Sequence, residues 1–374
     1  MIKRIGYYIF ASFFAVFRIF GIRRDKVFFV ATHDDSAEGN IGIVSRALTQ
    51  KKPEIHQFFL TRKDSFKKPI TFFVCKAYHM ATAGTIFLDN EFMPMAYTPI
   101  SKKAKVVQLW HGTGSIKKFG LDSEEGEVAD LARKANRRIT HLIVNSKLTQ
   151  KQYAGAFEIP EEKIYITGLP RTDLILDSQE IEKKRQTFRE QFPELQNKRC
   201  ILYAPTFRDE ETQKPGIHLD LDHLTGVMSE EDVLLLRLHP FVAANFDDTF
   251  VESRYHGKVK NVSQYDGVTT LLAVSDCLIT DYSSIVFEYC LFEKPMVFYA
   301  YDLEEFRDSG RGFYEDYESY VPGMIVRSQK ELEQKWGQWW DAPMDRIREF
   351  RDETYRYLDK NAVGRLFELI FGNE

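Results

Sequence analysis

Short apolar runs alternate with segments of helical spacing along most of the chain. Runs such as HLIVNS, KIYITG, RCILYAP and DCLITD are apolar throughout, which is typical of strands buried on both faces of a parallel sheet. Segments such as IGIVSRALTQ, with helical periodicity, lie between them. Strands that alternate with helices in this way predict βαβ units. The alternation pauses at TGLPRTD (167–173) and then resumes. We therefore expect an α/β protein built from two doubly wound halves.

The pause near residue 170 suggests where the chain divides. We expect a first Rossmann-type domain over residues 25–168 and a second one over residues 169–345. Residues 1–24 and 346–374 are predicted to be helical additions at the two ends, the latter from the amphipathic run DKNAVGRLFELIFG. In such sheets ligands bind at the carboxyl ends of the strands, so we expect a cleft there.

The N-terminal segment departs from this alternation. It holds an aromatic-rich apolar run over residues 5–17 with Lys and Arg on both sides. The run is shorter than the roughly 20 residues that a membrane-spanning helix needs, and no small-residue cleavage site follows it. One interpretation is a helix that lies in the headgroup region of an anionic membrane, which predicts a peripheral protein on the cytoplasmic face. The other is an ordinary helix whose Phe side chains join the core.

Composition excludes several classes of function. The formal net charge is −4 and the pI about 6.2, which argues against a general nucleic-acid binder. The four cysteines show no zinc-ligand spacing, and no acidic cluster has the spacing of a metal site, so we predict no tightly bound metal. Dependence on a divalent ion stays open. The chain has neither a GxGxxG nor a GxxxxGK[ST] loop, which argues against a nicotinamide cofactor or a P-loop.

Reactive side chains follow several predicted strands. His111 comes after QLW, Arg208 after ILYAP, His239 after VLLLRL, and the pair Ser283 and Ser284 after CLIT. Each position lies at the edge where doubly wound sheets bind ligands, so together they predict a common ligand. From these residues alone the prediction is a two-domain transferase that uses an activated phosphate compound.

The first of these positions lies in the loop QLWHGTGSIKKFG. Imidazole titrates near neutral pH, so His111 is a candidate to take a proton from an attacking hydroxyl. The glycines Gly112 and Gly114 allow a ligand to approach the backbone closely.

The other positions each have a structural alternative. Ser283 and Ser284 can cap a helix, hold a phosphate, or do both, and Glu288 lies one turn further on, where it can accept from a ribose hydroxyl. The histidine of RLHP can hold phosphate together with Arg237, or it can be an ordinary core histidine. Arg208 can pair with Asp209.

A second basic set lies in LARKANRRIT. Arg133, Lys134, Arg137 and Arg138 have the spacing of a continuous positive stripe on a helix. Such a stripe can face anionic lipid, or it can be a solvated helix face.

At these motifs the sequence resembles the CDP-glycerol glycerophosphotransferase family of teichoic-acid synthesis. The motifs are WHG with KKFG, TGLPRTD, ILYAPTFRD, RLHP, SDCLITDYSS, FEKPMVFYAYDLEEF and RGFY, in that order. The resemblance implies a GT-B fold and transfer of glycerol phosphate from CDP-glycerol to an acceptor hydroxyl, with release of CMP.

The resemblance also implies roles for individual residues. The histidine of WHG, His111, is implied to be the general base, and the RLHP histidine, His239, is implied to act at the donor diphosphate. Glu288 is expected at the cytidine ribose, where many members carry Asp. Residues implied at CDP-glycerol are Gly112, Thr113, Arg171, Pro205, Thr206, Arg208, Arg237, Ser283, Ser284 and Glu288. Acceptor-side residues or alternative bases are sought in the loop after the first strand, at Asp35, Glu38 and Asn40.

One loop narrows the expected branch of the family. Polymerising members usually read HGTPLKK where this chain reads HGTGSIKK, with Gly114 and Ser115. This loop and the EGN of residues 38–40 resemble the glycerol-phosphate primase branch. The primase adds one glycerol phosphate to the disaccharide ManNAc-GlcNAc on undecaprenyl diphosphate. The alternatives are a glycerol- or ribitol-phosphate polymerase or second-step enzyme, a transferase that uses a nucleotide-sugar, and a non-catalytic membrane assembly subunit.

Overall fold

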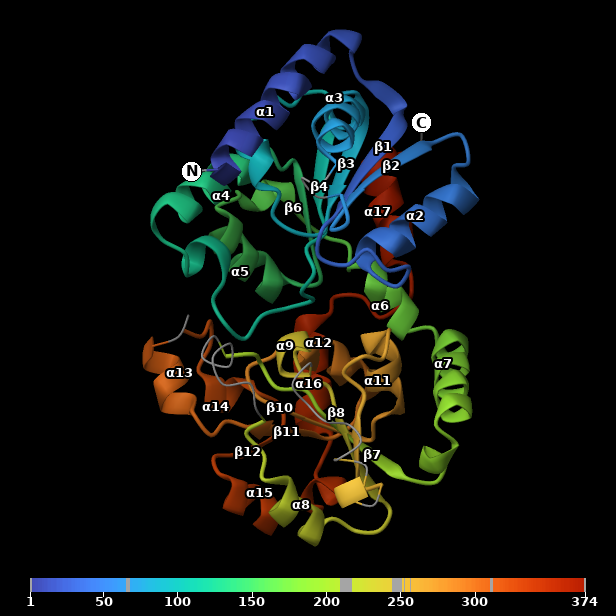
Figure 1. Ribbon diagram of the computed structural model, residues 1–374, viewed down its shortest axis with the longest axis vertical. Coiled ribbons are helices and arrows are strands. Elements are labelled where there is room, and N and C mark those ends of the chain that lie inside the picture. The colour runs from blue at the N-terminus through green and yellow to red at the C-terminus, as the bar shows by residue number, and fades with distance from the viewer. Residues whose placement is uncertain are drawn as a thin grey trace. The chain divides into compact units, whose positions relative to one another are not determined.

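The structure is a computed structural model that describes residues 2–64, 68–208, 217–243, 251, 253–255, 257–309 and 312–372. The chain forms two compact units, each with a six-stranded sheet (Figure 1). The first unit contains Met1–Thr113, Lys118–Leu174 and Thr354–Glu374, and the second contains Gly114–Lys117 and Ile175–Glu353. The last 21 residues therefore return to the first unit.

Both sheets are parallel in every strand pair that the structure describes, as the apolar runs predict. The first has the order β2-β1-β3-β4-β5-β6 and the second β12-β11-β10-β7-β8-β9. The strands of the first unit are β1 (Arg23–Ala31), β2 (His56–Thr61), β3 (Ala83–Leu88), β4 (Lys105–Gln108), β5 (His141–Val144) and β6 (Ile164–Ile166). Those of the second are β7 (Arg199–Tyr203), β8 (Asp232–Leu236), β9 (Val259–Asn261), β10 (Cys277–Thr280), β11 (Met296–Tyr299) and β12 (Met324–Val326).

Helices cover both faces of the first sheet, as expected for a doubly wound fold. One core contains side chains of α1 and α5, and the other contains side chains of α2 and α17. The helices are α1 (Ile2–Phe17), α2 (Asn40–Lys51), α3 (Ala77–Ala81), α4 (Gly126–Asn136), α5 (Lys147–Phe157), α6 (Pro170–Ile175), which ends at the passage to the second unit, and α17 (Ala362–Phe371).

The second unit is organised in the same way, with an apolar core that includes side chains from β7, β8, β10 and β11. Its helices include α7 (Ser178–Gln191), α8 (Leu221–Val227), α9 (Pro240–Ala243), α11 (Val268–Val274), α12 (Ile285–Tyr289), α13 (Leu303–Ser309), α14 (Tyr317–Tyr320), α15 (Gln329–Gln334) and α16 (Asp345–Thr354). The two parallel α/β units confirm the predicted fold class.

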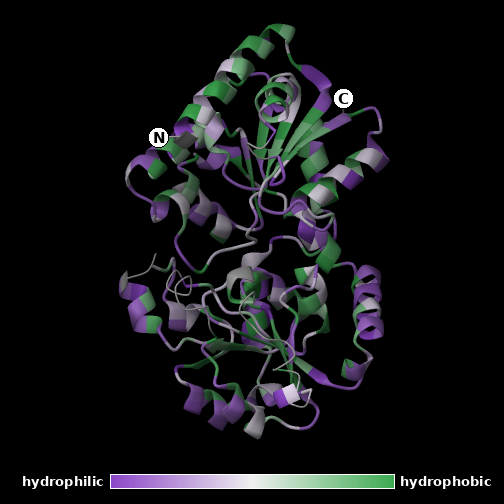
Figure 2. Cartoon of the chain, viewed as in Figure 1, coloured by the Kyte–Doolittle hydropathy of each residue, from purple (hydrophilic) through white to green (hydrophobic). Residues whose placement is uncertain are grey.

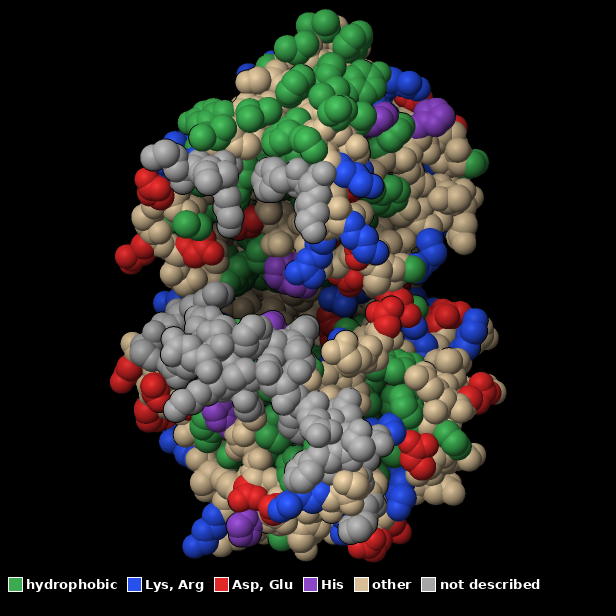
Figure 3. Space-filling model, in the orientation of Figure 1, with side chains coloured by type: hydrophobic (Ala, Val, Ile, Leu, Met, Phe, Trp, Pro, Cys, Tyr) green, Lys and Arg blue, Asp and Glu red, His purple; other side chains and the backbone are tan. Residues whose placement is uncertain are grey.

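Most of helix α1 is hydrophobic (Figure 2), and its apolar side chains lie on two faces. On one face Phe10 and Phe14 are fully buried in the core, and the Phe10 ring lies 5.5 Å from that of Phe72. On the other face large apolar side chains are exposed and gather over α1 (Figure 3). We call these side chains, together with two from the 3₁₀ turn that follows α1 (Arg18–Phe20), the apolar stripe: Ile5, Tyr8, Ile9, Phe13, Val16, Ile19 and Phe20. The core-helix interpretation thus accounts for one face of α1 and leaves the stripe unexplained. Among the described residues, none of the helices has the length and apolar character that crossing a bilayer requires.

The predicted positive stripe is wrong in part. Helix α4 ends at Asn136, so Arg137 and Arg138 lie beyond it. Arg133 pairs with Asp130 at 2.9 Å and with Glu158 at 2.7 Å, so its charge is compensated.

Candidate functional site

The loop after β4 is held by side chains from four other places in the first unit. The carbonyl of Trp110 accepts from the Asn40 amide at 3.0 Å, and that of His111 from the Arg171 guanidinium at 3.2 Å. The next two carbonyls, of Gly112 and Thr113, accept from Tyr153 at 2.9 Å and Asn145 at 2.8 Å. Four successive carbonyls thus have side-chain donors, which fixes the WHGT backbone.

The backbone of this loop is also strained at one position. Trp110 has a φ of 56°, in the left-handed region that a bulky residue rarely adopts. Such a conformation costs on the order of 1–3 kcal/mol and persists only where the surroundings enforce it. The strain turns the chain directly before His111, which stacks on the Trp110 ring at 4.0 Å.

His111 is oriented through one ring nitrogen. Its Nδ1 lies 3.1 Å from the carbonyl oxygen of Asp89, which follows β3. A carbonyl only accepts, so Nδ1 carries the hydrogen and Nε2 keeps its lone pair. Burial, the neighbouring His33 and Arg171 lower the pKa of His111 to about 3. The imidazole is therefore neutral, in the tautomer that can accept a proton at Nε2.

His33 lies against His111, with the two rings 3.8 Å apart and 11° from parallel. Burial, and secondarily Arg171, lower the pKa of His33 as well. The loop that carries His33 is held by the buried Asp89 carboxylate, which accepts from the backbone N–H groups of Thr32, His33 and Asp34 at 2.9–3.2 Å. One residue thus positions both histidines, His33 through its carboxylate and His111 through its carbonyl.

The predicted acceptor-side residues have different surroundings. Asn40 is buried and acts on the backbone, because its amide also accepts from the Arg171 N–H at 3.0 Å. Asp35 is exposed, and Glu38 is half-buried with contacts of its own. Arg171 lies in the first unit and bonds to the backbone of His111. Its contact with CDP-glycerol, which the family resemblance implies, stays a prediction.

The carboxyl edge of the second sheet is organised around Arg208. Its guanidinium contacts the Asp302 carboxylate at 2.8 and 3.1 Å and the Asp281 carboxylate at 2.9 Å. It also donates to the carbonyl of Thr206 at 2.6 Å. Burial alone would lower the pKa of Arg208, but the bonds and charges of the two carboxylates raise it overall. The expected alternative partner Asp209 lies outside the described residues.

The network extends into the backbone after β7 and β10. Asp281 accepts from the N–H groups of Thr206 at 2.8 Å and Tyr282 at 2.6 Å, and the Tyr282 hydroxyl donates to Asp302 at 2.9 Å. Arg208 therefore connects three strand ends, and its charge is shared between carboxylates within the protein. This is a scaffold for the edge, in addition to any role at a ligand.

Three predicted donor residues lie together in the second unit. Pro205, Thr206 and His239 line one small pocket, and the His239 ring stacks on Phe207 at 4.2 Å. Arg237 does not share this arrangement, because its Nη1 donates to the carbonyls of Val262, Ser263 and Tyr265 in the loop after β9.

The two serines before α12 are unlike each other. The Ser283 hydroxyl accepts from the N–H of Ile285 at 3.4 Å, a weak cap. Ser284 is the N-cap residue by position, but its hydroxyl caps nothing and has no hydrogen bond within the described part of the chain. Glu288, predicted at the ribose, is only 6% exposed.

Gly114 packs on α12 in the second unit. A Cβ at this position would lie 2.6 Å from the ring of Phe287, which is itself buried. Any side chain larger than that of glycine at position 114 would therefore collide with the Phe287 ring. The sequence shows the unusual glycine but not its neighbour.

Sequence reasoning missed three residues of these edges: His33, Asp89 and Asp302. Each lies within three residues of the carboxyl end of a strand. That position could have identified them as candidates from the sequence. No group of three or more His, Cys, Asp or Glu side chains arranged for a metal ion occurs among the described residues.

Comparisons with known proteins agree with this fold. Residues 11–372 match the family model of CDP-glycerol:poly(glycerophosphate) glycerophosphotransferase. The chain is 33% identical to a teichoic acid poly(ribitol-phosphate) polymerase of Bacillus spizizenii, over 88% of this chain and 54% of that protein. It is 30% identical to the teichoic acid glycerol-phosphate primase of Bacillus subtilis, over 87% of this chain and 81% of that protein.

A similar solved structure is that of the wall teichoic acid polymerase TagF, with a TM-score of 0.83 and 21% identity over 99% of this chain and 94% of that one. At this identity the likeness concerns the fold, which is of the GT-B type. The chain spans about half the length of the polymerase above, so similarity to it does not extend to that whole protein. Because the family model covers nearly all of the sequence, the chain belongs to the CDP-glycerol:poly(glycerophosphate) glycerophosphotransferase family.

Proposed function

We propose that the protein transfers glycerol phosphate from CDP-glycerol to a hydroxyl of a ManNAc-GlcNAc disaccharide carried on undecaprenyl diphosphate, with release of CMP. Family membership supports the donor and the reaction type. The loop with Gly114 and Ser115 supports the primase step over polymerisation. The observation that carries the proposal is the neutral His111 with Nδ1 held by the Asp89 carbonyl.

In the proposed step the acceptor oxygen attacks the β-phosphorus of CDP-glycerol, which bears the glycerol. The new P–O bond forms as the bond to the bridging oxygen breaks, and the electron pair leaves with CMP. The hydroxyl proton passes to Nε2 of His111. Hydrogen-bond donors at the second sheet edge, among them Ser284 and His239, stabilise the phosphate charge.

The low pKa of His111 needs the ligand to make it an effective base. A base works best when its pKa is near the working pH, and about 3 is well below that. A diphosphate brings negative charge, which favours the imidazolium form and raises its pKa. The fixed tautomer keeps the lone pair on Nε2, and the charge of the bound diphosphate raises the pKa of the ring. Proton transfer is therefore coupled to donor binding.

The apolar stripe of α1 suits a peripheral position at the cytoplasmic face of the membrane. Its seven apolar side chains stay exposed, although Tyr8, Phe13 and Phe20 each contact a neighbouring ring. A lipid-linked acceptor lies at the membrane that such a surface can bind. We propose that the stripe lies against the bilayer and presents the protein to this acceptor.

The test is CMP release with CDP-glycerol and the lipid-linked disaccharide, for the wild type and His111→Ala. Loss of a general base lowers turnover by about 10²–10⁴-fold. His33→Ala is the matched control, because it removes the stacked ring and leaves the Nδ1 contact of His111; we expect at most a tenfold loss. Near-normal turnover in His111→Ala would rule out the base and leave Asp35 or Glu38 to be tested.

Product mass separates the alternatives. A single added glycerol phosphate supports the primase step, whereas a ladder of products indicates a polymerase. If the enzyme turned over CDP-ribitol or a UDP-sugar but not CDP-glycerol, the proposed donor would be wrong. A folded protein that binds none of these donors would fit a non-catalytic assembly subunit.

A further inference from the structure

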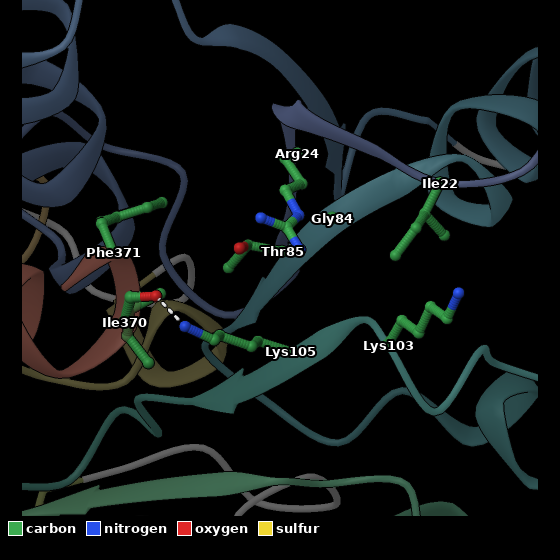
Figure 4. A pocket seen from close by; sticks show the side chains of 8 residues that line it. All are labelled: Ile22, Arg24, Gly84, Thr85, Lys103, Lys105, Ile370 and Phe371. Carbon is green, nitrogen blue, oxygen red and sulfur yellow. Dashed lines mark hydrogen bonds between the residues drawn. The ribbon is translucent and has the colours of Figure 1, made fainter. Parts of the chain in front are cut away.

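A second polar site lies at the opposite edge of the first sheet from His111. A pocket of about 150 Å³ opens at the amino ends of β1, β3 and β4 (Figure 4). Its lining residues are Ile22, Arg24, Gly84, Thr85, Lys103, Lys105, Ile370 and Phe371. The volume equals that of about five water molecules, which is room for a small polar group.

The described lining of this pocket is rich in cations. Among the described residues that line it, three side chains are cationic and none is acidic, in a chain whose net charge is −4. Lys103 has no ion pair within the described residues, and the Lys105 ammonium donates to the carbonyl of Ile370 at the end of α17. An ammonium has three N–H groups, so Lys105 keeps donors for a ligand.

A buried hydroxyl also lines the pocket. Thr85 is 5% exposed, and its hydroxyl has no hydrogen bond in the part of the chain that the structure describes. Figure 4 shows Arg24, Thr85 and Lys105 around one space. The Thr85 hydroxyl faces the pocket, so a ligand atom there can form a hydrogen bond with it.

The backbone is irregular where it presents Arg24. Arg23 lies opposite Ala83 and Val27 opposite Thr85, so four positions on β1 face two on β3. Such bulges redirect side chains at sheet edges. Gly84 makes room for the bulge, because a Cβ there would lie 2.7 Å from the Arg23 carbonyl oxygen.

We propose that this pocket binds a phosphate group through Arg24, Lys105 and the Thr85 hydroxyl, with Lys103 at its margin. Guanidinium and ammonium groups with a hydroxyl donor are the set that holds phosphate oxygens. The site is separate from the transfer reaction, and only its lipid source depends on the proposed membrane position of α1.

The group has two possible sources, a phospholipid headgroup and free phosphate. Ile22 in the pocket wall follows the apolar stripe by two residues, after Ile19 and Phe20, which are 78% and 63% exposed. A bilayer that covers the stripe would place its headgroups within reach of the pocket. The pocket then adds a specific headgroup contact to apolar insertion.

The test uses the full chain and two double variants of equal charge change. Arg24→Gln with Lys103→Gln removes two pocket cations, and Arg23→Gln with Lys102→Gln removes their sequence neighbours, which do not line the pocket. Arg23 is exposed and its pair with the half-buried Asp25 is open to solvent, so its loss has little effect on stability. Thr85→Val removes the hydroxyl without changing charge or branching.

Binding is measured by calorimetry with inorganic phosphate, and by flotation with phosphatidylcholine vesicles with and without phosphatidylglycerol. We expect the pocket double variant to weaken binding at least about tenfold, the neighbour variant less than about threefold, and Thr85→Val about threefold to tenfold. A difference with phosphatidylglycerol vesicles but not with phosphate identifies a lipid headgroup, and the reverse identifies free phosphate.

Equal losses in the two double variants would mean diffuse electrostatic attraction and would overturn the site, as would an absence of binding to either probe. CDP-glycerol affinity, measured in parallel, should be the same in all variants. A protein that fails to bind CDP-glycerol but shows the phosphate difference would refute the proposed function and leave this site standing.

Discussion

At the carboxyl edge of the first sheet the central polar groups are two stacked imidazoles, whereas at the edge of the second they are one guanidinium and two carboxylates. The pKa values of His33 and His111 are both lowered, so the first edge holds neutral rings. The second edge holds full charges, and Arg208 compensates them internally. A neutral ring can accept a proton without first losing an ion pair, whereas a compensated ion network holds its geometry when a charged ligand arrives.

The comparison also shows that most charged groups at these edges stabilise the backbone. Arg171 donates to the His111 carbonyl, and Arg237 donates to three loop carbonyls. Among the described groups that we propose to act on the ligand, Nε2 of His111 and the hydroxyl of Ser284 are uncharged. The two edges therefore differ in charge. At both of them, however, some polar side chains bond to the loop backbone and others are available to a ligand.

The largest effect is expected where charge is buried. Arg208→Met leaves Asp281 and Asp302 without their cation, and removal of one partner from a buried ionic network is destabilising by about 3–5 kcal/mol. The free energy of unfolding should fall by that amount in urea titrations. Arg307→Met is the control, since its pair with Glu304 is exposed and worth less than about 1 kcal/mol. Equal effects would show that the second edge is not a buried network.

These roles were only partly predictable from the sequence. The apolar runs named above predict β4, β5, β6, β7, β8 and β10, whereas no long run marks β12, a three-residue edge strand. They also place His111, His239 and Ser283 at strand ends. The sequence does not reveal whether a polar side chain at such an end turns to a carbonyl or outward, because that depends on which loops become neighbours after folding. Asn40 and Trp110 are 70 positions apart, and their contact has no local signal.

The next prediction concerns the loss of stability at low pH, which we expect to arise mainly from histidines of the first unit. Burial lowers the pKa of His111 to about 3 and those of His79 and His141 to about 4, all in the first unit. Below pH 6.5 the unfolded chain binds protons at these sites and the folded protein does not, so stability is present above pH 6.5 and is lost as the pH falls. Glu91, whose pKa burial raises to about 7, binds a proton when folded and offsets one histidine.

These four groups alone leave the unfolded chain with about two more protons, which corresponds to a loss of roughly 2.7 kcal/mol per pH unit between pH 6 and 5. The lowered pKa of His33 makes this slope steeper, and the raised pKa of His223 makes it shallower. Urea titrations at several pH values measure this slope. His111→Gln should reduce it by about 1.4 kcal/mol per pH unit, because one of the neutral rings is gone. A slope that His111→Gln leaves unchanged would mean that this imidazole is already charged in the folded protein, which would remove the contrast between the edges.

The smallest effect distinguishes two adjacent hydroxyls of the second edge. Ser283 accepts from the Ile285 N–H at 3.4 Å, whereas the Ser284 hydroxyl is exposed and caps nothing. Ser284→Ala should therefore weaken CDP-glycerol binding by roughly tenfold, the value of one hydrogen bond to a charged group, with unchanged stability. Ser283→Ala should lower the free energy of unfolding by about 0.5–1 kcal/mol and change affinity less. Calorimetry and urea titration of the same two variants measure both quantities. The reverse pattern would make Ser283 the ligand residue and Ser284 the cap, and the division between holding and outward-facing groups would then fail at the second edge.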